Sequence, residues 1–255
     1  MSATTLALVG ATGGAGTTRT AVELAAMGAR DGRTVAVVDA AYSTQGLSEY
    51  VSDRITTDVT GLVTDEPDEP LASATHEVGD ALPGTVALVP ARAPFERLAR
   101  AKTAEAARVL GDRIEEAATA YDHVVVDTPP VASNQAVAAV METDRVAAVL
   151  PASRHGRDAL QRLRGRIEDV GGDLHLSLAT GGDVPPADVA LPEPAGDVAG
   201  APEAGAGDGP YAEAVGRAFE GAFRTDLDVE FGEDGVLGQV KTATEQATER
   251  IGGRD

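Results

Sequence analysis

A glycine-rich turn near the start of the chain leads directly into a helical pattern. Residues 10–19 read Gly-Ala-Thr-Gly-Gly-Ala-Gly-Thr-Thr-Arg. A short apolar run at 6–9 precedes the turn, and apolar residues at helical spacing follow it from Thr18 to about Arg30. A strand, a glycine turn and a helix N-terminus in this order bring free backbone N–H groups together at the positive end of the helix dipole. The turn therefore predicts a site for an anion such as a phosphate group.

Two aspartates farther along the chain could complete such a site. Asp39 closes the apolar run 35–38, and Asp127 closes a similar run at 123–126. A carboxylate at the carboxyl end of a buried strand can hold a water on Mg²⁺ beside a hydroxyl of the turn. The metal ligands predicted in this way are Thr18, Asp39 and Asp127. The alternative is that the aspartates only cap strand ends in an α/β protein that binds no nucleotide.

The groups expected to contact phosphate are the turn itself and the first residues of the helix. Their backbone N–H groups form the cradle, and their side chains add hydroxyls and one cation. The residues predicted to bind phosphate are Gly13, Gly14, Ala15, Gly16, Thr17, Thr18 and Arg19.

Composition limits the classes of protein to be considered. The chain has 255 residues, of which 43% are apolar and only 3% aromatic, so a full core must be built from small aliphatic side chains. It has no cysteine, and its four histidines are scattered, which argues against disulfides and against a histidine–cysteine metal cluster. The net charge is −20 and only two residues are lysine, which is typical of adaptation to a salt-rich cytoplasm.

Apolar runs alternate with helical patterns along most of the chain. The predicted strands are at 6–9, 35–39, 86–90, 123–127, 145–150 and 174–178. The predicted helices are at 18–30, 93–120, 135–141 and 156–170. Alternation of this kind implies parallel strands joined by right-handed crossovers. The predicted fold class is α/β, with a doubly wound, mostly parallel sheet.

The chain divides into three predicted parts. Residues 1–182 form the α/β core, and residues 183–210, rich in Pro, Ala, Gly and Asp, form a flexible loop. Residues 211–255 form C-terminal helices that complete the domain.

The turn and the segments after it resemble the ParA/MinD family of deviant P-loop ATPases. The family's loop has the form Lys-Gly-Gly-x-Gly-Lys-Thr-Thr, and residues 12–19 here read Thr-Gly-Gly-Ala-Gly-Thr-Thr-Arg. The further segments that resemble the family are 20–25, 32–39, 127–130 and 142–160. The resemblance runs from about residue 4 to residue 178 and implies a P-loop NTPase-like fold that binds ATP or ADP with Mg²⁺.

The chain departs from the family at the positions that carry charge. Thr12 replaces the signature lysine, Thr17 replaces the Walker lysine, and Ala41 stands where the family has a second aspartate that orients water. Ala179 and Val131 replace an adenine-side asparagine and a glycine. Because phosphoryl transfer depends on stabilising charge, the resemblance implies weak binding of Mg-ATP or Mg-ADP and no active ATPase. The alternative is a weak but genuine ATPase that uses Arg19 as its cation.

A second class of protein also fits the glycine turn. Residues 10–16 match the Gly-x-x-Gly-x-x-Gly turn of short-chain dehydrogenase-like proteins, with Asp39 near the place of a ribose-binding acid. An NAD(P)-binding protein of this type is the alternative function. It lacks support elsewhere, because neither Lys102 nor Lys241 follows a tyrosine by four residues.

The expected function is that of a non-hydrolysing regulator or scaffold in cell spatial organisation, of the partitioning or division-site type. Protein partners and a homodimer are expected. Five arginines between Arg154 and Arg166 suggest nucleic acid as a less favoured partner. The segment 235–252 could form an amphipathic helix, but it lacks the bulk and charge of a membrane-surface helix. No stable membrane insertion is expected, and the predicted location is the cytoplasm.

Overall fold

An eight-stranded sheet forms the centre of the computed structural model, which describes residues 3–79 and 81–232. In their order across the sheet the strands are β3 (His76–Val78), β4 (Thr85–Val89), β2 (Thr34–Asp39), β5 (His123–Thr128), β1 (Thr4–Gly10), β6 (Arg145–Pro151), β7 (Leu176–Thr180) and β8 (Val189–Leu191). Among these described strands only β3 runs antiparallel to its neighbour. Because β1 lies between β5 and β6, the turn that follows it opens at the middle of the sheet's carboxyl edge.

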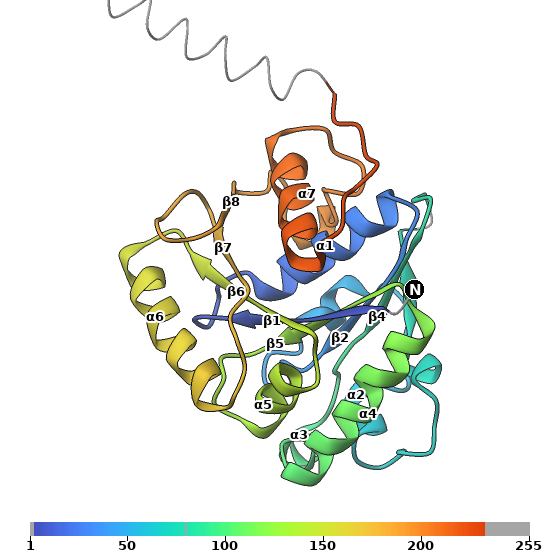
Figure 1. Ribbon diagram of the computed structural model, residues 1–255. Helices are drawn as coiled ribbons and strands as arrows, with labels where there is room; N and C mark the ends of the chain where they lie inside the picture. The colour runs from blue at the N-terminus through green and yellow to red at the C-terminus, as the bar shows by residue number, and fades with distance from the viewer. Residues whose placement is uncertain (1–2, 80, 233–255) are drawn as a thin grey trace, which may run out of the picture.

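Helices cover both faces of this sheet, as Figure 1 shows. On one face lie α1 (Thr17–Arg30) and α7 (Pro210–Phe223). On the other face lie α2 (Val59–Leu62), α3 (Phe95–Ala101), α4 (Ala104–Ala120), α5 (Asn134–Met141) and α6 (Arg154–Asp169). Short 3-10 turns are η1 (Gly46–Tyr50), η2 (Leu71–Ala74) and η3 (Val198–Gly200). The predicted doubly wound α/β fold is confirmed.

The helix predicted over 93–120 is two helices, α3 and α4. The first ends at Ala101, and Thr103 begins the second as its N-cap, where its side chain accepts a hydrogen bond from the Ala106 N–H at 3.3 Å. An N-cap threonine favours a new helix start over continuation of the previous one. The apolar spacing is similar on both sides of this break, so periodicity alone did not reveal it.

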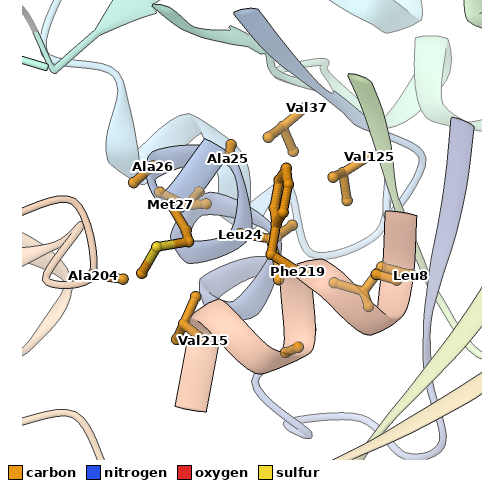
Figure 2. Packing of buried hydrophobic residues seen from close by; sticks show 14 of the residues in the cluster. Leu8, Leu24, Ala25, Ala26, Met27, Val37, Val125, Ala204, Val215 and Phe219 are labelled. Carbon is orange, nitrogen blue, oxygen red and sulfur yellow. The ribbon is translucent and has the colours of Figure 1, made fainter. Parts of the chain in front are cut away.

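Small side chains let α7 pack closely against α1 and the sheet. A Cβ atom at Gly28 of α1 would lie 2.8 Å from the ring of Phe219 and 2.7 Å from Val35. Figure 2 shows the Phe219 ring directed from α7 towards Val37 and Val125 of the sheet. Phe219 is one of the few aromatic residues of the chain and is fully buried, and glycine at position 28 provides the space that its ring occupies against α1.

The segment 183–210, whose composition suggested a linker, contains regular structure. Strand β8 extends the sheet beside β7, and η3 follows it. Ala204 is fully buried in the same core cluster as Met27 of α1 (Figure 2). This segment therefore contributes both a strand and a core residue.

His123 begins β5 at the amino edge of the sheet, away from the glycine turn. Its ring centroid lies 5.4 Å from that of Phe219 and 4.5 Å from that of Phe223, and Arg33 Nη1 lies 3.2 Å from its Nε2 atom. Burial, together with the charge of Arg33, lowers the pKa of His123 to about 4.

We expect His123 to make the protein less stable in mild acid. In the unfolded chain the imidazole is protonated below a pH of about 6.5, whereas in the folded protein it stays neutral down to about pH 4. The free energy of unfolding therefore falls as the pH falls through this window. Allowing for solvent screening at the sheet edge, the loss is about 2 kcal/mol. Urea denaturation at several pH values, compared with that of His123→Gln, measures it. Equal pH dependence in the two proteins would contradict the assignment.

Candidate functional site

A cavity of about 340 Å³ opens where β1, β2 and β5 end. Its lining comes from the glycine turn, from the loop after β2 and from the end of β5. The lining residues are Gly10, 12–19, Ala41, Thr44, Gly46 and 127–130. All seven residues predicted to bind phosphate therefore face one cavity, together with Thr18 and Asp127 of the predicted metal ligands.

The glycines of the turn adopt conformations that other residues disfavour. Gly14 has φ +73° and Gly16 has φ +83°, both in the left-handed region. A Cβ atom at Gly10 would lie 2.7 Å from Thr17 Oγ1, so glycine there lets the chain turn sharply into α1. Helix α1 begins at Thr17 with no side-chain cap, which leaves its first N–H groups available to an anion.

The two predicted carboxylates lie side by side. Asp39 and Asp127 are paired in register at the ends of β2 and β5, and both are buried. Asp39 accepts hydrogen bonds from the Ala41 N–H at 2.8 Å and from the Ala91 N–H at 3.3 Å. Burial raises the pKa of both carboxyl groups, and the neighbouring Asp127 charge raises the pKa of Asp39 further.

The donor set around Asp127 fits a divalent cation. Thr18 Oγ1 donates to Asp127 Oδ2 at 2.6 Å, while Asp127 Oδ1 is buried and has no hydrogen-bond partner among the described residues. An unpartnered buried carboxylate oxygen beside a hydroxyl is the kind of oxygen pair that Mg²⁺ prefers. Asp39 does not line the cavity itself, although it holds the backbone of Ala41, which does.

Basic side chains are scarce around this cavity. Thr12 and Thr17 line it at the positions where the ParA/MinD family has lysine. Arg19 is the one basic side chain among the described lining residues. The cradle therefore offers backbone N–H groups and hydroxyls, with little positive charge to balance a polyphosphate.

Arg19 is held by Glu23 of its own helix and by residues 197 and 203 of a distant segment. Its Nε donates to Glu23 Oε1 at 2.6 Å, its Nη2 to Glu203 Oε1 at 3.0 Å and its Nη1 to the Asp197 carbonyl at 2.9 Å. The Glu23 side chain has no exposed surface, and it also accepts the N–H groups of Glu203 and Ala204 at 3.1 and 2.7 Å. Turning Arg19 towards a phosphate would leave a buried carboxylate without its cation, which costs several kcal/mol.

The structure adds lining residues that the sequence did not reveal. Thr44 and Gly46 come from the loop after β2, and a Cβ atom at Gly46 would lie 3.2 Å from Thr18 Oγ1. Lys102 Nζ donates to Ser43 Oγ in the same loop at 2.7 Å. No motif marks this loop in the sequence, and only the sheet order brings it to the cavity.

Two other predicted features lie away from the cavity. The arginines from Arg154 to Arg166 are on α6, and none of them lines it. The amphipathic helix suggested for 235–252 lies outside the described residues. In the part of the chain that is described, no helix has the length and apolar character needed to cross a membrane.

The strand order excludes the dehydrogenase-like alternative. In the dinucleotide-binding fold the first strand pairs with the second. Here β5 separates β1 from β2, and Asp39 pairs with Asp127 instead of standing beside the glycine turn's own strand. The alternative of an NAD(P)-binding protein of the short-chain dehydrogenase-like type is therefore wrong.

Comparisons with known proteins agree with this topology. A sequence profile of the AAA domain family matches residues 3–179, while no curated protein matches significantly. The cell division ATPase MinD of Pyrococcus furiosus has a TM-score of 0.72 at 17% identity, covering 86% of this chain and 97% of its own. A chain of the MinC:MinD cell division protein complex of Aquifex aeolicus has a TM-score of 0.69 at 18% identity, covering 91% and 100%.

A third solved structure carries a ligand. The septum site-determining protein MinD of Pyrococcus horikoshii, complexed with Mg-ADP, has a TM-score of 0.64 at 18% identity, covering 75% of this chain and 82% of its own. At such identities these likenesses concern the fold, whereas the family profile spans more than half of the sequence. The chain therefore belongs to the AAA domain family, and its fold is that of the ParA/MinD P-loop ATPases.

Proposed function

We propose that this protein is a ParA/MinD-like regulator or scaffold that binds Mg-ATP or Mg-ADP weakly, does not hydrolyse ATP, and works through protein partners in partitioning or division-site placement. The observation that carries the proposal is the contrast within one cavity. The glycine cradle and the pair of Thr18 and Asp127 are in place, but the two lysine positions are threonines and Arg19 is bound to Glu23.

In this proposal the chain's own residues bind and orient the nucleotide. Backbone N–H groups from Gly13 to Thr17 would hold the phosphates at the N-terminus of α1. Thr18 and Asp127 would hold Mg²⁺ directly. Asp39 would contribute through the loop that it fixes at Ala41. When bound, the metal supplies the positive charge that the missing lysines do not.

The absence of hydrolysis follows from charge and position. A transferring phosphoryl group needs cations on its oxygens and a group that orients water. Among the described residues that line the cavity, the lysine positions hold neutral hydroxyls and position 41 is alanine. Alanine can neither accept a proton nor orient water, so ATP would bind without turning over.

The first test is the affinity for Mg-ATP. We expect Thr17→Lys to tighten binding at least tenfold, about 1.4 kcal/mol, because the variant supplies a cation in a cradle that is already formed. Isothermal titration with Mg-ATP and Mg-ADP in molar KCl measures the change. Equal affinities for the natural protein and the variant would show that lysine is not what limits binding.

The matched control tests the alternative in which Arg19 serves as the cation. In our proposal Glu23 holds Arg19 away from the phosphates. Replacing it in Arg19→Gln should therefore leave the weak affinity for Mg-ATP within about twofold of the natural value. A large loss of affinity in Arg19→Gln, with the fold retained by circular dichroism, would favour the alternative of a weak ATPase that uses Arg19.

A second expectation concerns assembly. The resemblance assigns to the signature lysine a contact across an ATP-bound dimer, and this position is Thr12 here. Any dimer of this protein should therefore form to the same extent with and without ATP. Light scattering at matched protein concentration checks this, and a monomer that dimerises only with ATP would contradict it.

A further inference from the structure

Helix α6 carries arginines around its exposed side. Its buried side, which includes Leu160, Leu163 and Ile167, packs into the core. The five arginines of the helix are all exposed, and none forms an ion pair or hydrogen bond with another described side chain. They are Arg154, Arg157, Arg162, Arg164 and Arg166. Other arginines of this acidic protein, such as Arg97 and Arg113, do pair with carboxylates.

The position of these charges is unfavourable for the helix itself. Arg154, His155 and Arg157 lie in the first turn of α6, which contains no acidic residue. The N-terminus of a helix carries a partial positive charge, so basic residues there are repelled. An anionic group from outside would therefore be attracted to this end of the helix.

A largely apolar hollow lies beside Arg166 of this helix. It has a volume of about 380 Å³ and is formed between α5 and α6 and the loop before α5. Its lining residues are Val131, Ala132, Val137, Arg166, Asp169 and Val170. Four of the six lining residues are thus valine or alanine, and the other two are charged side chains of α6.

We propose that the face formed by α5 and α6 docks an amphipathic segment of a partner protein, in which one large apolar side chain fills the hollow and flanking Asp or Glu side chains pair with the arginines of α6. The inference rests on the proposed function in one respect, namely that the chain works through a protein partner. It adds the surface and the chemistry of that partner.

The observations favour a protein over a nucleic acid at this face. An apolar centre with arginine at the rim is the usual anatomy of a protein interface. Asp158, Glu168 and Asp169 are exposed among the arginines and would repel the continuous row of phosphates of a nucleic acid. Carboxylates on a short peptide can instead pair with arginines one by one in bidentate geometry.

The hollow is joined to the nucleotide cavity by a short stretch of chain. Pro129 and Pro130 line the cavity, and the next two residues, Val131 and Ala132, line the hollow. A partner seated in the hollow and a ligand in the cavity therefore contact the same loop. Coupling between two such sites is reciprocal, so each ligand would change the affinity for the other by the same factor.

The test uses a labelled peptide of the same length as α6, 16 residues, with leucine at helical spacing and glutamate elsewhere. Fluorescence anisotropy should show binding to the full chain, without nucleotide. The double variant Arg162→Glu with Arg166→Glu, on the side of α6 that lines the hollow, and separately Val137→Asp, should each weaken binding at least about tenfold. Circular dichroism of each variant checks that the fold is kept, which separates lost binding from unfolding.

The matched control reverses the same number of charges elsewhere. Arg108 on α4 and Arg217 on α7 are exposed and also lack partners among the described residues, and their double reversal to Glu should leave peptide affinity within about twofold. Equal weakening in both double variants, or no binding of the peptide by the natural chain, would overturn the proposal.

Two further results would also overturn it in favour of another occupant. One is tighter binding of a labelled DNA duplex that is lost in the α6 variant. The other is self-association in sedimentation velocity that is lost in the same variant. Neither measurement involves ATP, so failure here leaves the predictions of weak Mg-ATP binding and absent hydrolysis to be judged by titration and phosphate release.

Discussion

The double substitution Thr17→Lys with Ala41→Asp is expected to give ATP hydrolysis at least about 100-fold above the background of the assay, in which the turnover of the natural chain should be undetectable. Both positions line the cavity, Thr17 as the first residue of α1 and Ala41 two residues after Asp39. The new cation and the new carboxylate would enter a frame in which Thr18 and Asp127 already stand 2.6 Å apart. Phosphate release in molar KCl measures the rate, and Thr12→Lys can be added to complete a dimeric site.

The control for this experiment is Asp127→Ala in the same background. It removes the carboxylate that contacts Thr18 and should return the rate to that of the blank. Robust turnover by the natural protein that Asp127→Ala abolishes would show that the chain is a working ATPase. Arg19 would then be the first residue to test for the role of the missing lysine.

Glu23→Ala is expected to lower the free energy of unfolding by about 3 kcal/mol. The side chain of Glu23 has no exposed surface, and its removal leaves three donors without their acceptor, namely Arg19 Nε and the N–H groups of Glu203 and Ala204. Urea denaturation measures the loss. Hydrogen exchange at the amides of Glu203 and Ala204 should accelerate, because their hydrogen bonds would be lost.

Two variants calibrate this result. Glu23→Gln keeps an acceptor oxygen without the charge and should lose less stability than Glu23→Ala. Glu115→Ala removes an exposed carboxylate from the middle of α4 and should change stability by no more than about 0.5 kcal/mol. If Glu23→Ala changed the free energy of unfolding as little as Glu115→Ala, the hydrogen bonds of the buried carboxylate would not be what stabilises the packing of residues 203 and 204 against α1.

The cradle and the carboxylates could be located from the sequence because their signals are local. The glycine turn lies between an apolar run and a helical pattern, and Asp39 and Asp127 each end an apolar run. Parallel strands place such ends along one edge, and the structure brings Asp127 to Thr18 at 2.6 Å. The break between α3 and α4 was missed because a single N-cap, Thr103, interrupts an otherwise continuous helical pattern.

The partners of Arg19 could not be found in the same way. Glu203 lies 184 residues farther along the chain, in a stretch whose composition suggests a linker. Glu23 occupies a helical position where an acid is ordinarily solvated, and its burial depends on the backbone of residues 203 and 204. Both facts arise from long-range packing, which neither periodicity nor a short motif encodes.

The position of α7 at the end of the described chain has a consequence for biosynthesis. During translation all residues that line the cavity, from Gly10 to Pro130, are synthesised well before Phe219 of α7. Until then the apolar side of α1, which α7 covers, remains open to solvent, and chains at this stage are prone to aggregate. The nascent protein therefore exposes this apolar surface until α7 docks, and a chain that terminated before residue 210 would carry its glycine cradle beside an uncovered part of the core.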